Sequence, residues 1–143
     1  MTDSAPGSVQ ATPRLLLRLE GLVLLAAAVL AYAWTGDSWL MFGLVFFAPD
    51  LGMLGYLVDA RIGARVYNAA HTTIAPGILA SAGLLLGAPV AVSLAAIWAA
   101  HIGFDRLLGY GLKYATGFGD THLGALRAGE VRQPDARRRI CRA

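Results

Sequence analysis

The chain has 143 residues, of which 57% are hydrophobic and only 15% are charged, and its mean hydropathy is +0.57. Soluble domains carry about 25% charged residues, so this composition argues against a soluble globular protein. The net charge of +3 is gathered at the ends of apolar segments, which also argues against nucleic acid as a partner.

The order of polar and apolar stretches predicts one membrane domain, residues 14–114, with polar flanks. Residues 1–13 are small, polar and proline-bearing, and we expect them to be disordered. The chain contains four apolar segments, and the length of each is close to the ~20 residues needed to cross a hydrocarbon core of ~30 Å. These segments cover approximately residues 15–34, 38–58, 66–86 and 88–108. The pattern predicts an all-α, antiparallel bundle of four transmembrane helices, then a cap segment at 115–127 and a basic, flexible tail at 128–143.

The basic residues lie at one end of these predicted helices. Every Lys and Arg falls before the first segment or in its first turn, between the second and third, or at and after the end of the fourth. The opposite turns, near residues 35–38 and 87–89, contain none. This positive-inside pattern predicts a multi-pass membrane protein with both termini in the cytoplasm.

The second apolar segment contains a proline followed by a carboxylate. Pro49 removes a backbone donor and disfavours helical backbone at Ala48, so we expect a kink there. Asp50 follows directly. Irregular backbone at membrane depth is tolerated where it faces protein or a wet cavity.

The tight turn at 87–89 makes the third and fourth helices antiparallel neighbours. The fourth helix carries small residues spaced by four, Gly103 included, and we expect these residues to face the third helix.

Each predicted helix carries an ionisable group in its cytoplasmic half. His101 and Asp105 are spaced i, i+4, so they share a helix face, as do Asn68 and His71 at i, i+3. At ~1.5 Å per residue, these groups and Glu20 and Asp50 lie roughly 5 to 12 Å from the inner ends of their spans. Such groups are costly in hydrocarbon and mark functional sites by default.

Imidazoles and carboxylates at one depth are natural ligands of zinc, iron or manganese. The predicted metal ligands are Asp50, His71, His101 and Asp105. The predicted catalytic side chains are Glu20 as general base, Asp50 as a residue shared with the metal, and Lys113 as a group that steadies an anionic substrate. The predicted supporting or lid residues are Asn68, Tyr110, Asp120 and His122.

Plainer interpretations apply to each of these residues alone. A membrane-embedded His or Asp can serve only as a hydrogen-bond partner of another helix. Asp105 can pair with Arg106 or Lys113 at the interface, and Glu20 can snorkel toward a neighbouring arginine. Tyr110 and Lys113 also fit an interfacial anchor, and the Asp120–His122 pair fits a loop cap.

Five sequence blocks, in order, resemble the DUF4260 family. They span about residues 14 to 124 and read LRLEG, FFAPDLGMLGYL, VYNAAHT, HIGFDRLLGYGLKY and GFGDTHLG. The resemblance implies a small bacterial integral membrane protein with four helices and no assigned activity. The blocks contain the same acidic, imidazole and amide side chains that the depth estimate selects.

The sequence leaves three classes of function open. The first is a metal-dependent hydrolase or oxidase acting on a lipid-like substrate in the bilayer. The second is a small transporter or proton-relay protein, which four short helices would require to form a homo-oligomer. The third is a non-catalytic scaffold subunit whose polar layer specifies helix packing.

Overall fold

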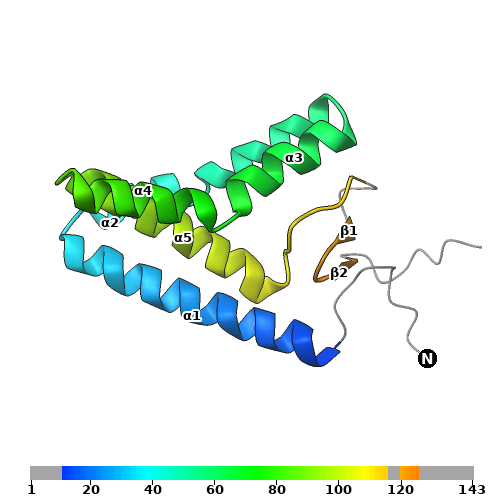
Figure 1. Ribbon diagram of the computed structural model, residues 1–143, viewed down its shortest axis with the longest axis horizontal. Coiled ribbons are helices and arrows are strands. Elements are labelled where there is room, and N and C mark those ends of the chain that lie inside the picture. The colour runs from blue at the N-terminus through cyan, green and yellow to red at the C-terminus, as the bar shows by residue number, and fades with distance from the viewer. Residues whose placement is uncertain (1–10, 116–119, 126–143) are drawn as a thin grey trace, which may run out of the picture.

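The computed structural model describes residues 11–115 and 120–125 (Figure 1). Its helices are α1 (Ala11–Thr35), α2 (Trp39–Phe46), the 3-10 helix η1 (Ala48–Leu57), α3 (Ala60–His71), α4 (Ile74–Leu85) and α5 (Pro89–Leu108). A short antiparallel ladder follows, with β1 (Asp120–Thr121) and β2 (Gly124–Ala125). The predicted helical class is confirmed, whereas the ladder was not expected. The predictions for residues 1–10 and 128–143 fall outside the described residues.

Helix α5 is the central element, because it packs against α1, α2 and α4. Its closest approach to α1 occurs at a pair of glycines. A Cβ atom on Gly103 would lie 2.6 Å from the backbone nitrogen of Leu25 and 2.8 Å from the backbone oxygen of Gly21. Only a residue without a side chain fits this crossing. The prediction that Gly103 faces the third helix is therefore wrong, although α4 and α5 are neighbours as expected.

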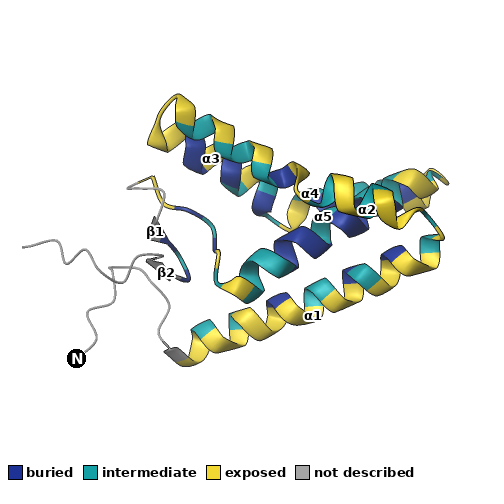
Figure 2. Cartoon of the chain, turned by 180° about the vertical axis from the view of Figure 1, so that it is seen from behind, coloured by how far each residue is buried: buried dark blue, intermediate teal, exposed yellow. Residues whose placement is uncertain are grey.

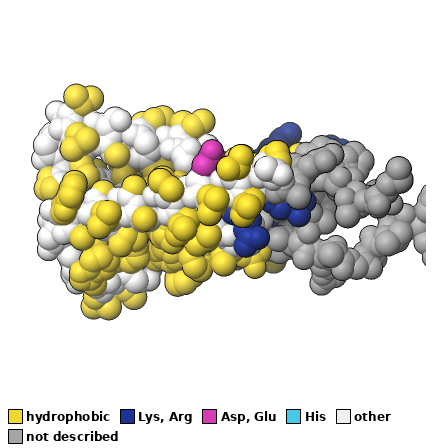
Figure 3. Space-filling model, turned by 90° about the horizontal axis from the view of Figure 1, so that it is seen from below, with side chains coloured by type: hydrophobic (Ala, Val, Ile, Leu, Met, Phe, Trp, Pro, Cys, Tyr) yellow, Lys and Arg dark blue, Asp and Glu magenta, His cyan; other side chains and the backbone are white. Residues whose placement is uncertain are grey.

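Among the described residues, three helical stretches are long and apolar enough to cross a membrane: Thr12–Thr35, Trp39–Leu57 and Pro89–Leu108. Only 17% of the first is buried inside the protein, and Figure 2 shows exposed residues along most of α1. Hydrophobic side chains cover much of the face in Figure 3. Exposed apolar surface on this scale would promote aggregation in water but is stable against lipid chains, which is consistent with a membrane protein.

The predicted continuous helix at 66–86 is wrong, because two shorter helices occupy this region. Helix α3 ends at His71, Thr72 has extended backbone (φ −82°, ψ 142°), and α4 begins at Ile74. Pro76 accounts for the break, since a proline ring clashes with the helical carbonyl four residues earlier, here that of Thr72. The chain changes partners at this point: α3 packs on η1, and α4 packs on α5.

The second apolar segment changes its winding beside the predicted interruption. Helix α2 ends at Phe46, and η1 continues with 3-10 geometry from Ala48. The backbone N–H of Asp50 donates to the Phe47 carbonyl at 3.1 Å, which is a bond of the 3-10 type. Asp50, at the start of this 3-10 helix, lies beside α5. The change of winding is observed, whereas a bend of the helix axis at Pro49 remains a prediction.

Candidate metal centre

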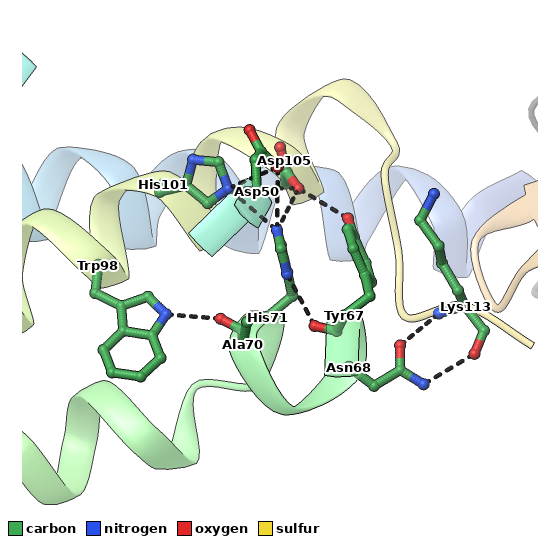
Figure 4. A network of polar contacts seen from close by, with 9 residues as sticks. All are labelled: Asp50, Tyr67, Asn68, Ala70, His71, Trp98, His101, Asp105 and Lys113. Carbon is green, nitrogen blue, oxygen red and sulfur yellow. Dashed lines mark hydrogen bonds and ion pairs between the residues drawn. The ribbon is translucent and has the colours of Figure 1, made fainter. Parts of the chain in front are cut away.

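Four ionisable side chains from three elements converge at one point (Figure 4). Asp50 comes from the start of η1, His71 from the last position of α3, and His101 and Asp105 from one face of α5. One ligand atom from each lies within 4.8 Å of the others. The structure thus brings together all four residues that the sequence predicts as metal ligands.

The spacing of the four atoms is close to that of a metal coordination shell. The two Nε2 atoms are 3.1 Å apart. His71 Nε2 lies 3.5 Å from Asp50 Oδ1 and 3.4 Å from Asp105 Oδ2, and His101 Nε2 lies 3.5 and 3.9 Å from the same two atoms. Tetrahedral ligands at ~2.0–2.2 Å from a zinc ion are separated by about 3.3–3.6 Å.

Tyr67 orients both His71 and Asp105, and the sequence analysis did not select it. Its carbonyl lies 2.9 Å from His71 Nδ1. A carbonyl only accepts, so Nδ1 carries the proton and the neutral ring presents a free electron pair on Nε2 to the cluster. The Tyr67 ring stacks on the His71 ring at 3.7 Å, and its hydroxyl donates to Asp105 Oδ2 at 3.0 Å. Its i, i+4 spacing from His71 is the signal that could have found it.

The cluster is shielded on its α2 side and more open at Asp50. The exposed fraction is 1% for His101 but 29% for the Asp50 side chain. Phe46 and Phe47 pack edge-on against the His101 ring, with centroids at 5.3 and 6.4 Å. Trp98, also missed by the sequence analysis, donates from its indole nitrogen to the Ala70 carbonyl at 2.6 Å. A ligand therefore reaches the cluster from the Asp50 side.

Asn68 holds the segment after α5 against α3. Its Nδ2 donates to the Lys113 carbonyl at 2.8 Å, and the Lys113 N–H donates to its Oδ1 at 2.7 Å. The Lys113 side chain is buried, with Nζ 4.6 Å from the centre of the Tyr67 ring. Burial lowers the pKa of Lys113, against the opposing effect of the Asp105 and Asp50 carboxylates. Asn68 thus acts on the site through the backbone of Lys113.

The other predicted site residues lie outside the four-residue cluster. Glu20 is exposed on α1, so the geometry gives no support to its predicted role as general base. His122 accepts a hydrogen bond from the Leu112 N–H at 2.9 Å and packs on Gly111, which makes it a support of this segment rather than a lid over the cluster. Asp120 contributes backbone to β1, and its side chain is outside the described part of the structure.

A cavity of about 330 Å³ adjoins the cluster. Three cluster residues and Lys113 share its wall with tyrosines and apolar side chains. The full lining is Phe47, Asp50, Met53, Tyr67, His101, Phe104, Asp105, Leu108, Tyr110 and Lys113. Tyr110, a predicted supporting residue, therefore lines the cavity without joining the cluster.

Comparisons with known proteins identify the family and nothing closer. No curated protein and no solved structure matches the chain. The model of the domain of unknown function DUF4260 matches residues 14–126, which is most of the chain, and the protein therefore belongs to this family.

Proposed function

We propose that this protein is a membrane metalloprotein whose Asp50, His71, His101 and Asp105 side chains bind one divalent transition metal ion. The observation that carries the proposal is the convergence of four ligand atoms, with His71 Nε2 aimed at the shared point by the Tyr67 carbonyl. Two imidazole nitrogens and two carboxylate oxygens suit zinc, iron or manganese.

The charge of the cluster favours a bound cation over simple helix pairing. Asp50 and Asp105 lie around the same two imidazoles, in a region of low dielectric constant. Two carboxylates brought together there repel each other and lose hydration. A divalent ion offsets both costs, whereas a scaffold role would leave them offset only in part, by the Tyr67 hydroxyl and the Lys113 ammonium.

The cavity beside the cluster favours catalysis, and we infer hydrolysis of a lipid-like substrate. A bound metal ion would lower the pKa of a coordinated water to about 7 and polarise a substrate carbonyl. Asp50 is the most exposed member of the cluster and lines the cavity, so it lies where substrate would approach. The apolar walls suit a lipid chain, and Tyr67 and Asn68 would preserve the geometry.

The surroundings of the cluster argue against transport. Along α5, the residues between Ser93 and His101 are apolar apart from the Trp98 indole, which is bonded to Ala70. Helix α2 carries no ionisable or hydroxyl side chain at all. An ion or proton path needs polar groups through the whole span, and α5 supplies no ionisable or hydroxyl side chain between Ser93 and His101.

For the topology, we propose four crossings of the bacterial inner membrane, with α3 and α4 together forming a broken third span. Both termini would be cytoplasmic, as the basic residues indicate. The end of α3 would be tolerated at this depth because Trp98 bonds the Ala70 carbonyl and the next residue but one to it in the chain, Thr72, is half-buried. His71 would then lie at the broken end, in the cytoplasmic half.

Elemental analysis of protein purified in mild detergent tests the metal proposal. We expect about one equivalent of zinc, iron or manganese in the wild type, and loss of this metal in His71→Ala and His101→Ala. His122→Ala is the matched control, because this imidazole lies outside the cluster. Chelation should lower the melting temperature of the wild type, since a ligand at a hundred times its Kd contributes about 2.7 kcal/mol.

The contrary outcome is clear-cut. Wild-type protein that is folded and monodisperse, yet takes up none of the three metals on reconstitution, would remove the proposal. Metal that persists in both histidine variants would show that it binds elsewhere.

A further inference from the structure

We propose that the cavity beside the cluster binds an anionic amphiphile, with its acidic head group between the Lys113 ammonium and the metal cluster. The inference rests on the proposed function, because it needs the charge of the metal ion. The inference extends the proposed function by naming a substrate class and a residue that binds the anionic group.

The lining of the cavity combines charged and apolar side chains. Asp50, His101 and Asp105, which lie together in the cluster, form its charged end, and Lys113 contributes the opposite charge. The wall contains Phe104 and also Phe47 and Leu108, which are exposed on the surface of the protein. The wall is thus continuous with exposed apolar surface, so a chain dissolved in the bilayer can enter with its head group toward the cluster.

The net charge of this end selects for an anion only when metal is bound. The Asp50 and Asp105 carboxylates contribute two negative charges, and Lys113 contributes one positive charge. Without metal the site is therefore net negative by one charge. A divalent ion reverses the sign to one positive charge, which a single carboxylate or phosphate diester group would neutralise.

Lys113 is held in a fixed position for this role. Its side chain is 5% exposed, and its Nζ lies over the rings of Tyr67 and Tyr56, at 4.6 and 5.9 Å from their centroids. A partly desolvated ammonium attracts an anion more strongly than a surface lysine does. Asn68 bonds the backbone of Lys113, not its side chain. Substitution of the Lys113 side chain therefore leaves the two bonds of Asn68 to this segment in place.

Binding of labelled decanoate and decanol to protein in neutral phosphatidylcholine nanodiscs tests the inference. The two probes share a chain and differ in charge, and empty nanodiscs give the partition background. We expect metal-loaded wild type to bind decanoate at least about tenfold more tightly than metal-free protein or Lys113→Met does. Decanol binding should be the same in all three. Arg65→Met, which removes an exposed cation from α3, should behave as wild type.

The outcomes separate this inference from the metal proposal. Lys113→Met should keep its metal, and Lys113→Arg should keep the preference for decanoate. Stoichiometric metal without any preference for decanoate over decanol, or a preference unchanged in Lys113→Met, would overturn the anion site and leave the metal site standing. Should Lys113→Met fail to fold, equal decanoate binding by loaded and metal-free wild type overturns it as well. A wild type that binds no metal overturns both proposals.

Discussion

Tyr67 is the residue on which the geometry of the centre most depends. It contacts His71 through its carbonyl and its ring, Asp105 through its hydroxyl, and Lys113 through the face of its ring. Each contact positions a different charge or electron pair. Groups that orient metal ligands typically affect metal affinity about 10- to 100-fold, so a residue that binds no metal can still decide whether the site is occupied.

Tyr67→Phe isolates one of these contacts. The variant keeps the ring and the carbonyl but loses the hydroxyl that donates to Asp105. We expect metal affinity to fall about tenfold, because Asp105 is no longer held in place. Competition with a chromogenic chelator measures this. Tyr110→Phe is the control, since Tyr110 is a more exposed tyrosine lining the same cavity. Equal affinities in the two variants would show that the hydroxyl has no part in metal binding.

The sequence predicts the clustering of these four residues because each pair has a spacing or depth that constrains it. His101 and Asp105 are one turn apart, and Asp50 and His71 occur at similar depth. Glu20 shows the limit of this reasoning, since depth says nothing of the direction in which a side chain points. Its neighbour Gly21 faces α5, and consecutive helical residues are about 100° apart, so Glu20 points elsewhere.

At the level of elements, the break between α3 and α4 is what delivers His71 to the site. A helix end leaves carbonyl groups without partners inside the helix. Trp98, from α5, donates to one of them at Ala70, next to His71. The indole thus ties the broken end to the helix that carries His101 and Asp105.

Trp98→Phe tests this tie. The variant keeps an aromatic ring but removes the donor, leaving the Ala70 carbonyl without this bond. We expect a loss of about 1–3 kcal/mol in stability and weaker metal binding, because the last turn of α3 is less well held. Reversible unfolding in mixed detergent micelles and chelator competition measure the two effects. Trp34→Phe is the control, since Trp34 is 87% exposed. A Trp98→Phe protein as stable as this control would contradict the assignment.

The elements themselves were only partly predictable. Long apolar runs identify α1 and α5 because hydrocarbon thickness sets their length. The break at Thr72 was missed because the apolar run was extended through the polar residues Asn68, His71 and Thr72, and Pro76 is the residue that signals the backbone conflict. The β1–β2 ladder is a short local hairpin, but the segment that it bridges at Lys113 is placed by a contact between residues distant in sequence, that of Asn68 with Lys113. Local propensity does not encode such contacts.

At the scale of the molecule, the site lies toward one end, where basic residues gather. The start of α1, the turn between η1 and α3, and the β ladder occupy the same end of Figure 1, opposite the α1–α2 and α4–α5 turns. Arg61, Arg65 and Lys113 belong to this end, and Figure 3 shows basic side chains there. Since cytoplasmic loops carry the excess of Lys and Arg, this arrangement predicts a site close to the cytoplasmic surface.

Cysteine labelling tests this topology and the crossing by the broken helix together. In a Cys141→Ser background, which removes the single native cysteine, one reporter precedes the break and one follows it. Ala60→Cys lies at the start of α3, and Leu86→Cys follows α4 at a position that is 81% exposed. A membrane-impermeant maleimide is then applied to spheroplasts, with and without permeabilisation.

We expect Leu86→Cys to react in sealed spheroplasts and Ala60→Cys only after permeabilisation, because α3 and α4 together then carry the chain across the bilayer. Restoring Cys141 alone should match Ala60→Cys if the C-terminus is cytoplasmic. If both reporters react from the same side, the broken helix turns back within the membrane instead of crossing it. Three crossings would then place the two termini on opposite sides, and Cys141 would react on the side opposite the N-terminus. The labelling pattern of these three positions therefore decides between a four-crossing bundle and a three-crossing fold with a re-entrant α3–α4 pair.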